Sequence, residues 1–183
     1  MAEQADFEFG RLLVVAFEGW NDAGEAASGA VRMLREQLDL EQLAAVDPED
    51  YFDYQFNRPL IAVDDDGNRT LTWPTVALFG PTKPLEVPLE LADDALLGVT
   101  GDNGSNIYLL VGNEPSRGWK TFTAEILDAI VDSGITTIVF LGAMLADVPH
   151  TRPISVFVSS ENASVREHLS IERSSYEGPV GIL

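Results

Sequence analysis

The sequence predicts a single α/β domain. Three short apolar runs, residues 12–17, 106–111 and 135–141, have the length and composition of strands buried on both faces of a sheet. An amphipathic helical pattern follows each of the first two runs. Strands joined through such a helix run parallel and cross over right-handed, so the last two runs predict a β-α-β unit.

The first of these elements is a strand that leads through a polar loop into a helix. Gly19 and Gly24 allow the sharp turn, and Asn21 or Asp22 can cap the new helix through a side-chain oxygen. The apolar positions of the helix recur at helical spacing and form one stripe: Ala27, Ala30, Val31, Leu34 and Leu38. This loop carries more polar and aromatic residues than a plain connection needs.

The rest of the chain adds shorter elements. Asp66 and Gly67 separate two β-forming runs and predict a hairpin. A helix begins near Trp119 and ends near Ser133, with Phe122 on its apolar face. Residues 81–104 hold three prolines and several acids, so they predict a long irregular excursion. The further predicted strands cover residues 43–47, 60–63, 70–73, 75–79 and 154–158.

Composition excludes several classes of partner and site. The net charge of -19, from 30 acidic and 11 basic residues, opposes binding to nucleic acid or to anionic membranes. The absence of cysteine excludes disulfides and thiolate sites, and two histidines provide no convincing transition-metal site. The acidic N-terminus lacks a signal-peptide pattern, and the longest apolar run, residues 138–146, is too short to span a membrane. We therefore expect a cytoplasmic protein of 183 residues without a metal.

Sequence motifs of common enzymes are absent. The chain has no phosphate-binding glycine loop, no Gly-x-Ser-x-Gly elbow, no His-Glu-x-x-His pair and no dinucleotide fingerprint. No residue is nominated as a nucleophile. We therefore expect no cofactor, and catalytic residues stay unassigned.

Candidate site residues follow from the predicted topology. In an open parallel sheet, ligands bind beyond the carboxyl ends of the strands, where three polar loops of this chain would meet. Arg58 and Arg152 each precede a proline and are expected in extended backbone, ready to bind a carboxylate or phosphate or to pair with one of the many acids. His150 is a candidate general base, or it holds its loop by a hydrogen bond. The ligand-binding or interface candidates are Glu18, Trp20, Asn21, Asp22, Arg58, Asn113, Glu114, His150 and Arg152.

Three segments resemble the proteasome assembly chaperone 2 family, and most closely its actinobacterial branch. They are Phe17-Glu18-Gly19-Trp20-Asn21-Asp22-Ala23-Gly24, then Gly112-Asn113-Glu114-Pro115 with Trp119, then Leu145-Ala146-Asp147-Val148-Pro149-His150-Thr151-Arg152-Pro153. Asn57-Arg58-Pro59 and Trp73-Pro74 fit the same pattern, and the likeness extends from about residue 12 to the end.

The resemblance implies a three-layer α/β/α sandwich with a mostly parallel mixed sheet, similar to the nucleoside phosphorylase fold. Eukaryotic members of the family help to assemble the proteasome α-ring, and the actinobacterial relatives resemble homotrimers. The resemblance also predicts that this chain, residues 1–183, lacks a C-terminal helical extension present in relatives.

Three functional readings follow. The first is a non-catalytic assembly or binding protein, with proteasome α-subunits as candidate partners. The second is an enzyme, a hydrolase, a phosphorylase or a carboxylate-amine ligase, that acts on a small anionic substrate at the carboxyl rim of the sheet. The third assigns the rim residues to a trimer interface.

Overall fold

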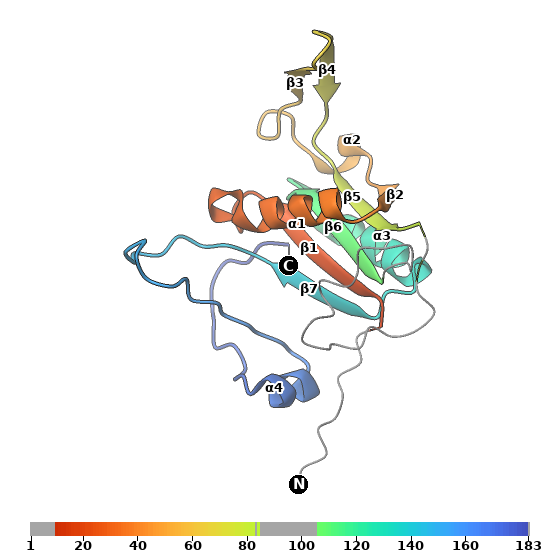
Figure 1. Cartoon of the computed structure of the whole chain (residues 1–183). Helices are drawn as coiled ribbons and strands as arrows, with labels where there is room; N and C mark the ends of the chain where they lie inside the picture. Colours follow the sequence, from red (N-terminus) through yellow and green to blue (C-terminus); the bar gives the residue numbers. More distant parts are fainter. Residues whose placement is uncertain (1–9, 83, 85–105, 183) are drawn as a thin grey trace. The chain divides into compact units, whose positions relative to one another are not determined.

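The structure is a computed structural model that describes residues 10–82, 84 and 106–182. The chain divides into two units (Figure 1): the larger extends to Met144 and takes in Ile182, and the smaller comprises Leu145–Gly181. All strands belong to the larger unit, whereas the smaller one contains a single helix, α4 (Ala163–Leu169). That residues 1–183 fold as one domain and lack an extension stays a prediction.

A five-stranded mixed sheet with the order β2-β5-β6-β1-β7 forms the centre of the larger unit. Its strands are β1 (Leu12–Glu18), β2 (Leu40–Ala45), β5 (Val76–Pro81), β6 (Ile107–Asn113) and β7 (Thr137–Leu141). β1 runs parallel to both β6 and β7, and the β2–β5 and β5–β6 pairs are antiparallel. The predicted parallel β-α-β unit is therefore confirmed, with β1 placed between its two strands.

Helices cover both faces of this sheet, as the three-layer prediction requires (Figure 1). Alternate residues of β1 point to opposite faces. Leu13, Val15 and Phe17 belong to the cluster under α3 (Trp119–Asp132), which contributes Phe122 and Ile130. The opposite cluster joins Ala16 of β1 to the α1 helix (Ala26–Gln37) through Ala27 and Val31. Burying one such large aliphatic side chain contributes roughly 1.5–3 kcal/mol, so these two clusters supply the main stabilisation.

A two-stranded hairpin lies outside the main sheet. β3 (Leu60–Val63) and β4 (Arg69–Thr72) pair antiparallel, which confirms the hairpin predicted around Asp66 and Gly67. A short helix that the sequence analysis did not predict, α2 (Pro48–Tyr51), precedes it. Proline at the first helical turn and an Asp47 side chain that accepts the Glu49 N–H at 2.9 Å explain its start.

Two strand predictions need correction. The strand expected at residues 43–47 spans Leu40–Ala45, because pairing with β5 sets its register across a bulge near Gln42. Residues 154–158 form no strand, although their β-forming composition is clear, because composition alone does not supply a hydrogen-bonded neighbour. The excursion predicted for residues 81–104 lies almost wholly outside the described residues.

The α4 helix, Ala163–Leu169, was not predicted by the sequence analysis. Asn162 caps it by accepting the N–H groups of Ser164 and Val165 at 2.9 and 3.3 Å.

None of the helices that the structure describes combines the length and apolar character needed to cross a membrane.

Candidate functional site

Three neighbouring parallel strands end at the same edge of the sheet, which we call the carboxyl rim. Glu18 and Asn113 are register partners at the ends of β1 and β6. The loop after β1 is fixed to the chain after β7, because Ala143 donates to the Asn21 carbonyl at 2.9 Å and Ala23 donates to the Ala143 carbonyl at 2.9 Å. The ends of β1, β6 and β7 therefore meet at one edge of the sheet, as the topology predicts.

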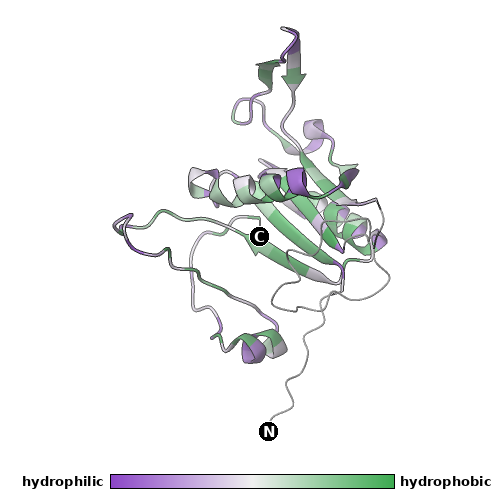
Figure 2. Cartoon of the chain, in the orientation of Figure 1, coloured by the Kyte–Doolittle hydropathy of each residue, from purple (hydrophilic) through white to green (hydrophobic). Residues whose placement is uncertain are grey.

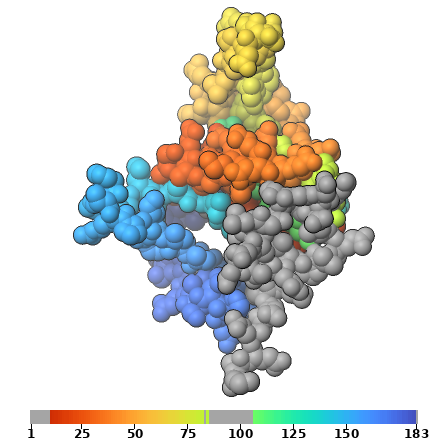
Figure 3. All heavy atoms as spheres, in the orientation of Figure 1, coloured from red at the N-terminus to blue at the C-terminus, as the bar shows by residue number. Residues whose placement is uncertain are grey.

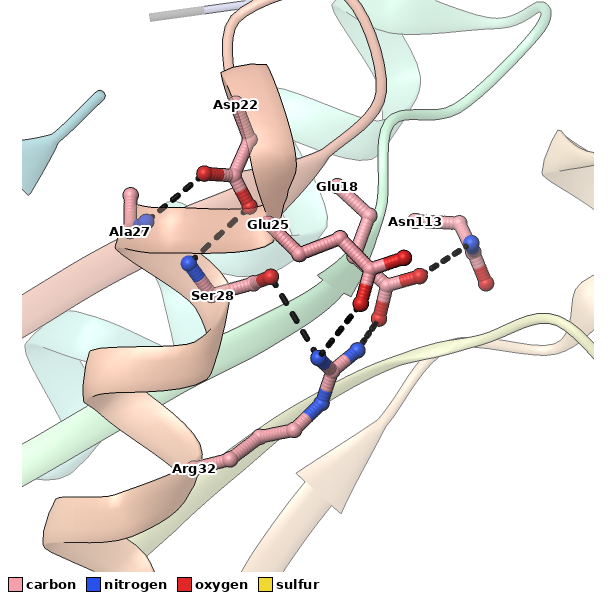
Figure 4. A network of polar contacts seen from close by, with 7 residues as sticks. All are labelled: Glu18, Asp22, Glu25, Ala27, Ser28, Arg32 and Asn113. Atoms are coloured by element: carbon pink, nitrogen blue, oxygen red, sulfur yellow. Dashed lines mark hydrogen bonds and ion pairs between the residues drawn. The ribbon is translucent and has the colours of Figure 1, made fainter. Parts of the chain in front are cut away.

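The Glu18 carboxylate is the centre of a polar network at this rim (Figure 4). One oxygen forms an ion pair with Arg32 of α1, and the other accepts the Asn113 amide at 2.9 Å. Arg32 also donates to the Ser28 hydroxyl at 3.3 Å and lies 3.8 Å from the Glu25 carboxylate. Each charge of this network thus has a partner within the protein.

The sequence predicts that either Asn21 or Asp22 caps the first helix, and in the structure the cap is Asp22. Its two carboxylate oxygens accept the N–H groups of Ala27 and Ser28 at 2.7 and 3.0 Å (Figure 4). Burial acts to raise the pKa of the Asp22 carboxyl, but the hydrogen bonds from Ser28 and Ala27 and the charge of Arg32 outweigh it, so the pKa lies below its usual value. The residue directly before the helix, Glu25, has φ of 54° and provides no side-chain cap. Asp22 reaches past it because Ala23–Glu25 form a 3₁₀ turn.

Glu114 and Trp20 complete the rim in different ways. The Glu114 N–H donates to the Glu18 carbonyl at 3.1 Å, and its carboxylate accepts the Ile182 N–H at 2.9 Å. Trp20 instead leaves 64% of its surface exposed, although the loop around it is anchored on both sides. An exposed aromatic on a fixed loop is suited to contact a partner.

Arg58 belongs to a different surface of the larger unit. It lines a hollow of about 480 Å³. The residues around this hollow are Glu49, Phe52, Asp53, Tyr54, Gln55, Arg58 and Arg117. Arg117 is committed to backbone carbonyls, those of Asp50 at 3.2 Å and of Glu49, whereas Arg58 makes no hydrogen bond or ion pair with any residue that the structure describes. Arg58 therefore does not join the Glu18 network.

His150 and Arg152 belong to the smaller unit. Both are exposed, and a hydrogen bond from the Arg152 N–H to the Pro149 carbonyl at 3.0 Å closes their turn. The predicted convergence of these two residues with the rim stays a prediction.

Sequence reasoning missed the basic residue that organises the rim. Ser28 and Arg32 are four residues apart on α1. Residues at this spacing lie on one face of a helix, so the sequence alone could have identified the pair. It also missed the contact of Tyr51 with Glu125, for which no local pattern exists, because the two residues are far apart in the sequence. The hydrogen bond to Glu125, together with burial, raises the pKa of Tyr51 to about 12.

The polar groups at the carboxyl rim are engaged mainly with one another. Among residues 10–82, 84 and 106–182, no three His, Asp or Glu side chains are grouped so that they could hold a metal ion. The rim carboxylates accept hydrogen bonds from the protein's own N–H and guanidinium groups, an arrangement that holds loops in place.

The comparisons with known proteins agree with this fold. A PAC2 crystal structure from Streptomyces avermitilis is 38% identical with a TM-score of 0.71, over 93% of this chain and 66% of that one. A proteasome-assembly chaperone homologue from Mycobacterium tuberculosis is 37% identical with a TM-score of 0.72, over 93% of this chain and 65% of that one. A second Mycobacterium tuberculosis structure, described as of unknown function, is 27% identical with a TM-score of 0.70, over 95% of this chain and 54% of that one.

The chain spans about two thirds of the length of the first two structures. No curated protein matches its sequence. The likeness to the nucleoside phosphorylase fold stays a prediction. The family model of the PAC2 family matches residues 16–183. On this match and on two structural relatives above 30% identity, the chain belongs to the PAC2 family.

Proposed function

We propose that this chain is a non-catalytic assembly protein that acts in the cytoplasm on proteasome α-subunits, as a homo-oligomer. Membership of the PAC2 family and the likeness to a proteasome-assembly chaperone homologue support the proposal. The trimer expected from the resemblance is the assembly state that we propose first.

One observation carries the non-catalytic part of this proposal: the rim polar groups bind one another. Glu18 is shared between Arg32 and Asn113, and both oxygens of Asp22 are used by the helix N-terminus. An active site holds groups in reserve for substrate, with pKa values matched to proton transfer. The Asp22 pKa is instead shifted down, which keeps its carboxylate charged and hydrogen-bonded near neutral pH.

Trp20 is the residue that we propose contacts the partner. Interfaces draw most of their binding energy from a few aromatic and arginine side chains. The Trp20 loop is held by the two hydrogen bonds that join Asn21 and Ala23 to Ala143, so little conformational entropy is lost when a partner binds. An exposed ring on a rigid loop therefore combines contact area with preorganisation.

Native mass spectrometry of the chain mixed with proteasome α-subunits from the same source tests the proposal. We expect a defined complex that Trp20→Ser weakens at least tenfold, equivalent to about 1.4 kcal/mol. Met33→Ser is the matched control, because Met33 is 62% exposed on α1 and its loss should leave both binding and stability unchanged. Absence of any complex with α-subunits, or equal binding by the two variants, would contradict the proposal.

The enzymatic alternative predicts a different result in a simple binding experiment. If a small anion is the substrate, phosphate or a small carboxylate should raise the melting temperature, and Arg152→Ala should abolish that shift without lowering the melting temperature itself. Saturable stabilisation of this kind together with no α-subunit complex would favour the enzyme.

A further inference from the structure

The hairpin formed by β3 and β4, residues 60–72, exposes an apolar surface that its own chain leaves uncovered. Every residue of both strands is exposed, and the hairpin extends clear of α1 (Figure 3). β3 is hydrophobic throughout, β4 contributes one hydrophobic residue, Leu71, and the turn at the tip is hydrophilic (Figure 2). A hairpin of two strands is only marginally stable alone in water, so packing of this surface would stabilise it.

The strand register divides the four apolar residues of β3 between the two faces of the hairpin. Ile61 lies directly opposite Leu71, and Val63, two residues from Ile61, lies on the same face opposite Arg69. Ile61, Leu71 and Val63, which we call the arm face, are 57%, 53% and 66% exposed in that order. On the reverse face, Leu60 and Ala62 lie opposite threonines, so two neutral hydroxyl side chains interrupt its apolar area.

The two ends of the hairpin differ in charge. The tip carries Asp64, Asp65 and Asp66 against one cation, Arg69, and Asp64 is used within the turn to accept the Asp66 and Asn68 N–H groups at 3.1 and 2.7 Å. Asp65 and Asp66 make no ion pair within the described part of the chain. The tip thus has negative charge that is free to attract a cation.

The base of the hairpin carries such a cation. Arg58 lies two residues before β3, lines the hollow described above and is unpaired among the described residues. Arg117 adds a second positive charge to the hollow, and Glu49 and Asp53 balance the pair. The chain as a whole has a net charge of -19, so most of its surface repels an acidic segment. This hollow instead offers arginine side chains to such a segment.

We propose that the hairpin docks on the hairpin of a second copy of this chain, with the two arm faces packed together and the strands of the two copies antiparallel. Four-residue strands are about 13 Å long at 3.3 Å per residue. An antiparallel alignment therefore brings the Asp65–Asp66 tip of each copy to the Arg58 base of the other, and keeps the two acidic tips apart. A parallel alignment would oppose six aspartates, which disfavours it.

This contact is two-fold and self-complementary, so it produces even-numbered assemblies. If the chain also forms the proposed trimer through another surface, the hairpins join two trimers into a hexamer. Three such contacts would then act together, which strengthens an interface that is small on its own.

Disulfide trapping tests the contact directly, because the chain has no cysteine of its own. Gln55→Cys places a thiol in the hollow while keeping Arg58, and Asp65→Cys places one at the tip while keeping Asp66. Each protein then carries one cysteine, so any disulfide must join two chains. A mixture of the two single-cysteine proteins should form a crosslinked heterodimer under mild oxidation.

Asp65→Cys mixed with Thr123→Cys, an exposed position on α3, is the matched control and should not crosslink. Crosslinking of Asp65→Cys with itself, or with Thr123→Cys, to the same extent as with Gln55→Cys would overturn the proposal.

Native mass spectrometry provides a second readout. The wild-type chain should form dimers or hexamers, and Ile61→Asp with Leu71→Asp should raise the dissociation constant at least a hundredfold. Both positions are exposed, so the doubly substituted chain should still fold. Trimers or monomers alone would overturn the hairpin contact but leave the proposed assembly function standing.

Discussion

Asp22→Ala is the substitution whose effect the structure allows us to work out in most detail. The Asp22 side chain is 5% exposed and satisfies two N–H groups in the first turn of α1, at 2.7 and 3.0 Å. Loss of a helix cap costs about 0.5–2 kcal/mol, and hydrogen bonds to a charged group lie at the upper end of the usual range. We therefore expect Asp22→Ala to lower the free energy of unfolding by about 2 kcal/mol, or the melting temperature by about 4–8 °C for a chain of this size.

Urea unfolding at pH 7, followed by circular dichroism, measures this loss. Asp22→Asn retains one acceptor oxygen and should lose about half as much, roughly 1 kcal/mol. The effect should also depend on pH. Because the folded pKa of Asp22 lies below its unfolded value, its stabilisation is complete above the unfolded pKa and is lost as the pH falls through the folded pKa.

The difference in stability between wild type and Asp22→Ala should therefore shrink at pH values below about 4. A loss smaller than about 0.5 kcal/mol at pH 7, or a difference that grows on acidification, would refute the capping argument.

The remaining predictions concern packing, alkaline titration and the rim. A Cβ at Gly112 would overlap the Thr75 carbonyl and lie 2.7 Å from the Val76 Cα, so Gly112→Ala should destabilise by about 3 kcal/mol. Gly29→Ala, with nothing within 4 Å, should stabilise α1 by about 0.5–1 kcal/mol in the same urea experiment. The pKa of Tyr51 is about 12 in the folded chain, above the 10.0 usual for tyrosine, so its contribution is complete below pH 10 and is lost as the pH rises toward 12. Tyr51→Phe should reduce the loss of stability in that window, as measured by unfolding at a series of pH values. For the ion pair of Glu18 with Arg32, a double-mutant cycle with Glu18→Gln and Arg32→Met should give a coupling of about 0.5–1 kcal/mol, and additive effects would show that the pair contributes nothing.

The sequence predicted those elements whose signals are local. The strand at Leu12–Glu18, both long helices and the hairpin around Gly67 follow from apolar periodicity and turn chemistry. The placement of β1 between β6 and β7 depends on pairing between distant strands, and no local pattern encodes it. Residues 154–158 show the converse error, since their β-forming composition was not accompanied by a paired neighbour.

The candidate site was predicted in outline only. Topology correctly placed Glu18 and Asn113 together, because parallel strands end at one edge. It did not separate Arg58 from them, since the position of Arg58 depends on how the segment after α2 packs against Arg117. It also omitted Arg32, because the ion pair between Arg32 and Glu18 depends on how α1 packs on β1, a tertiary contact that no local pattern encodes.

The most direct test of the assembly function is the rate at which purified proteasome α-subunits form closed rings, followed over time by native mass spectrometry with and without this chain. The account predicts that the chain accelerates ring formation and that Trp20→Ser removes most of the acceleration while Met33→Ser retains it. A ring-formation rate that is the same with and without the chain would contradict the proposed function.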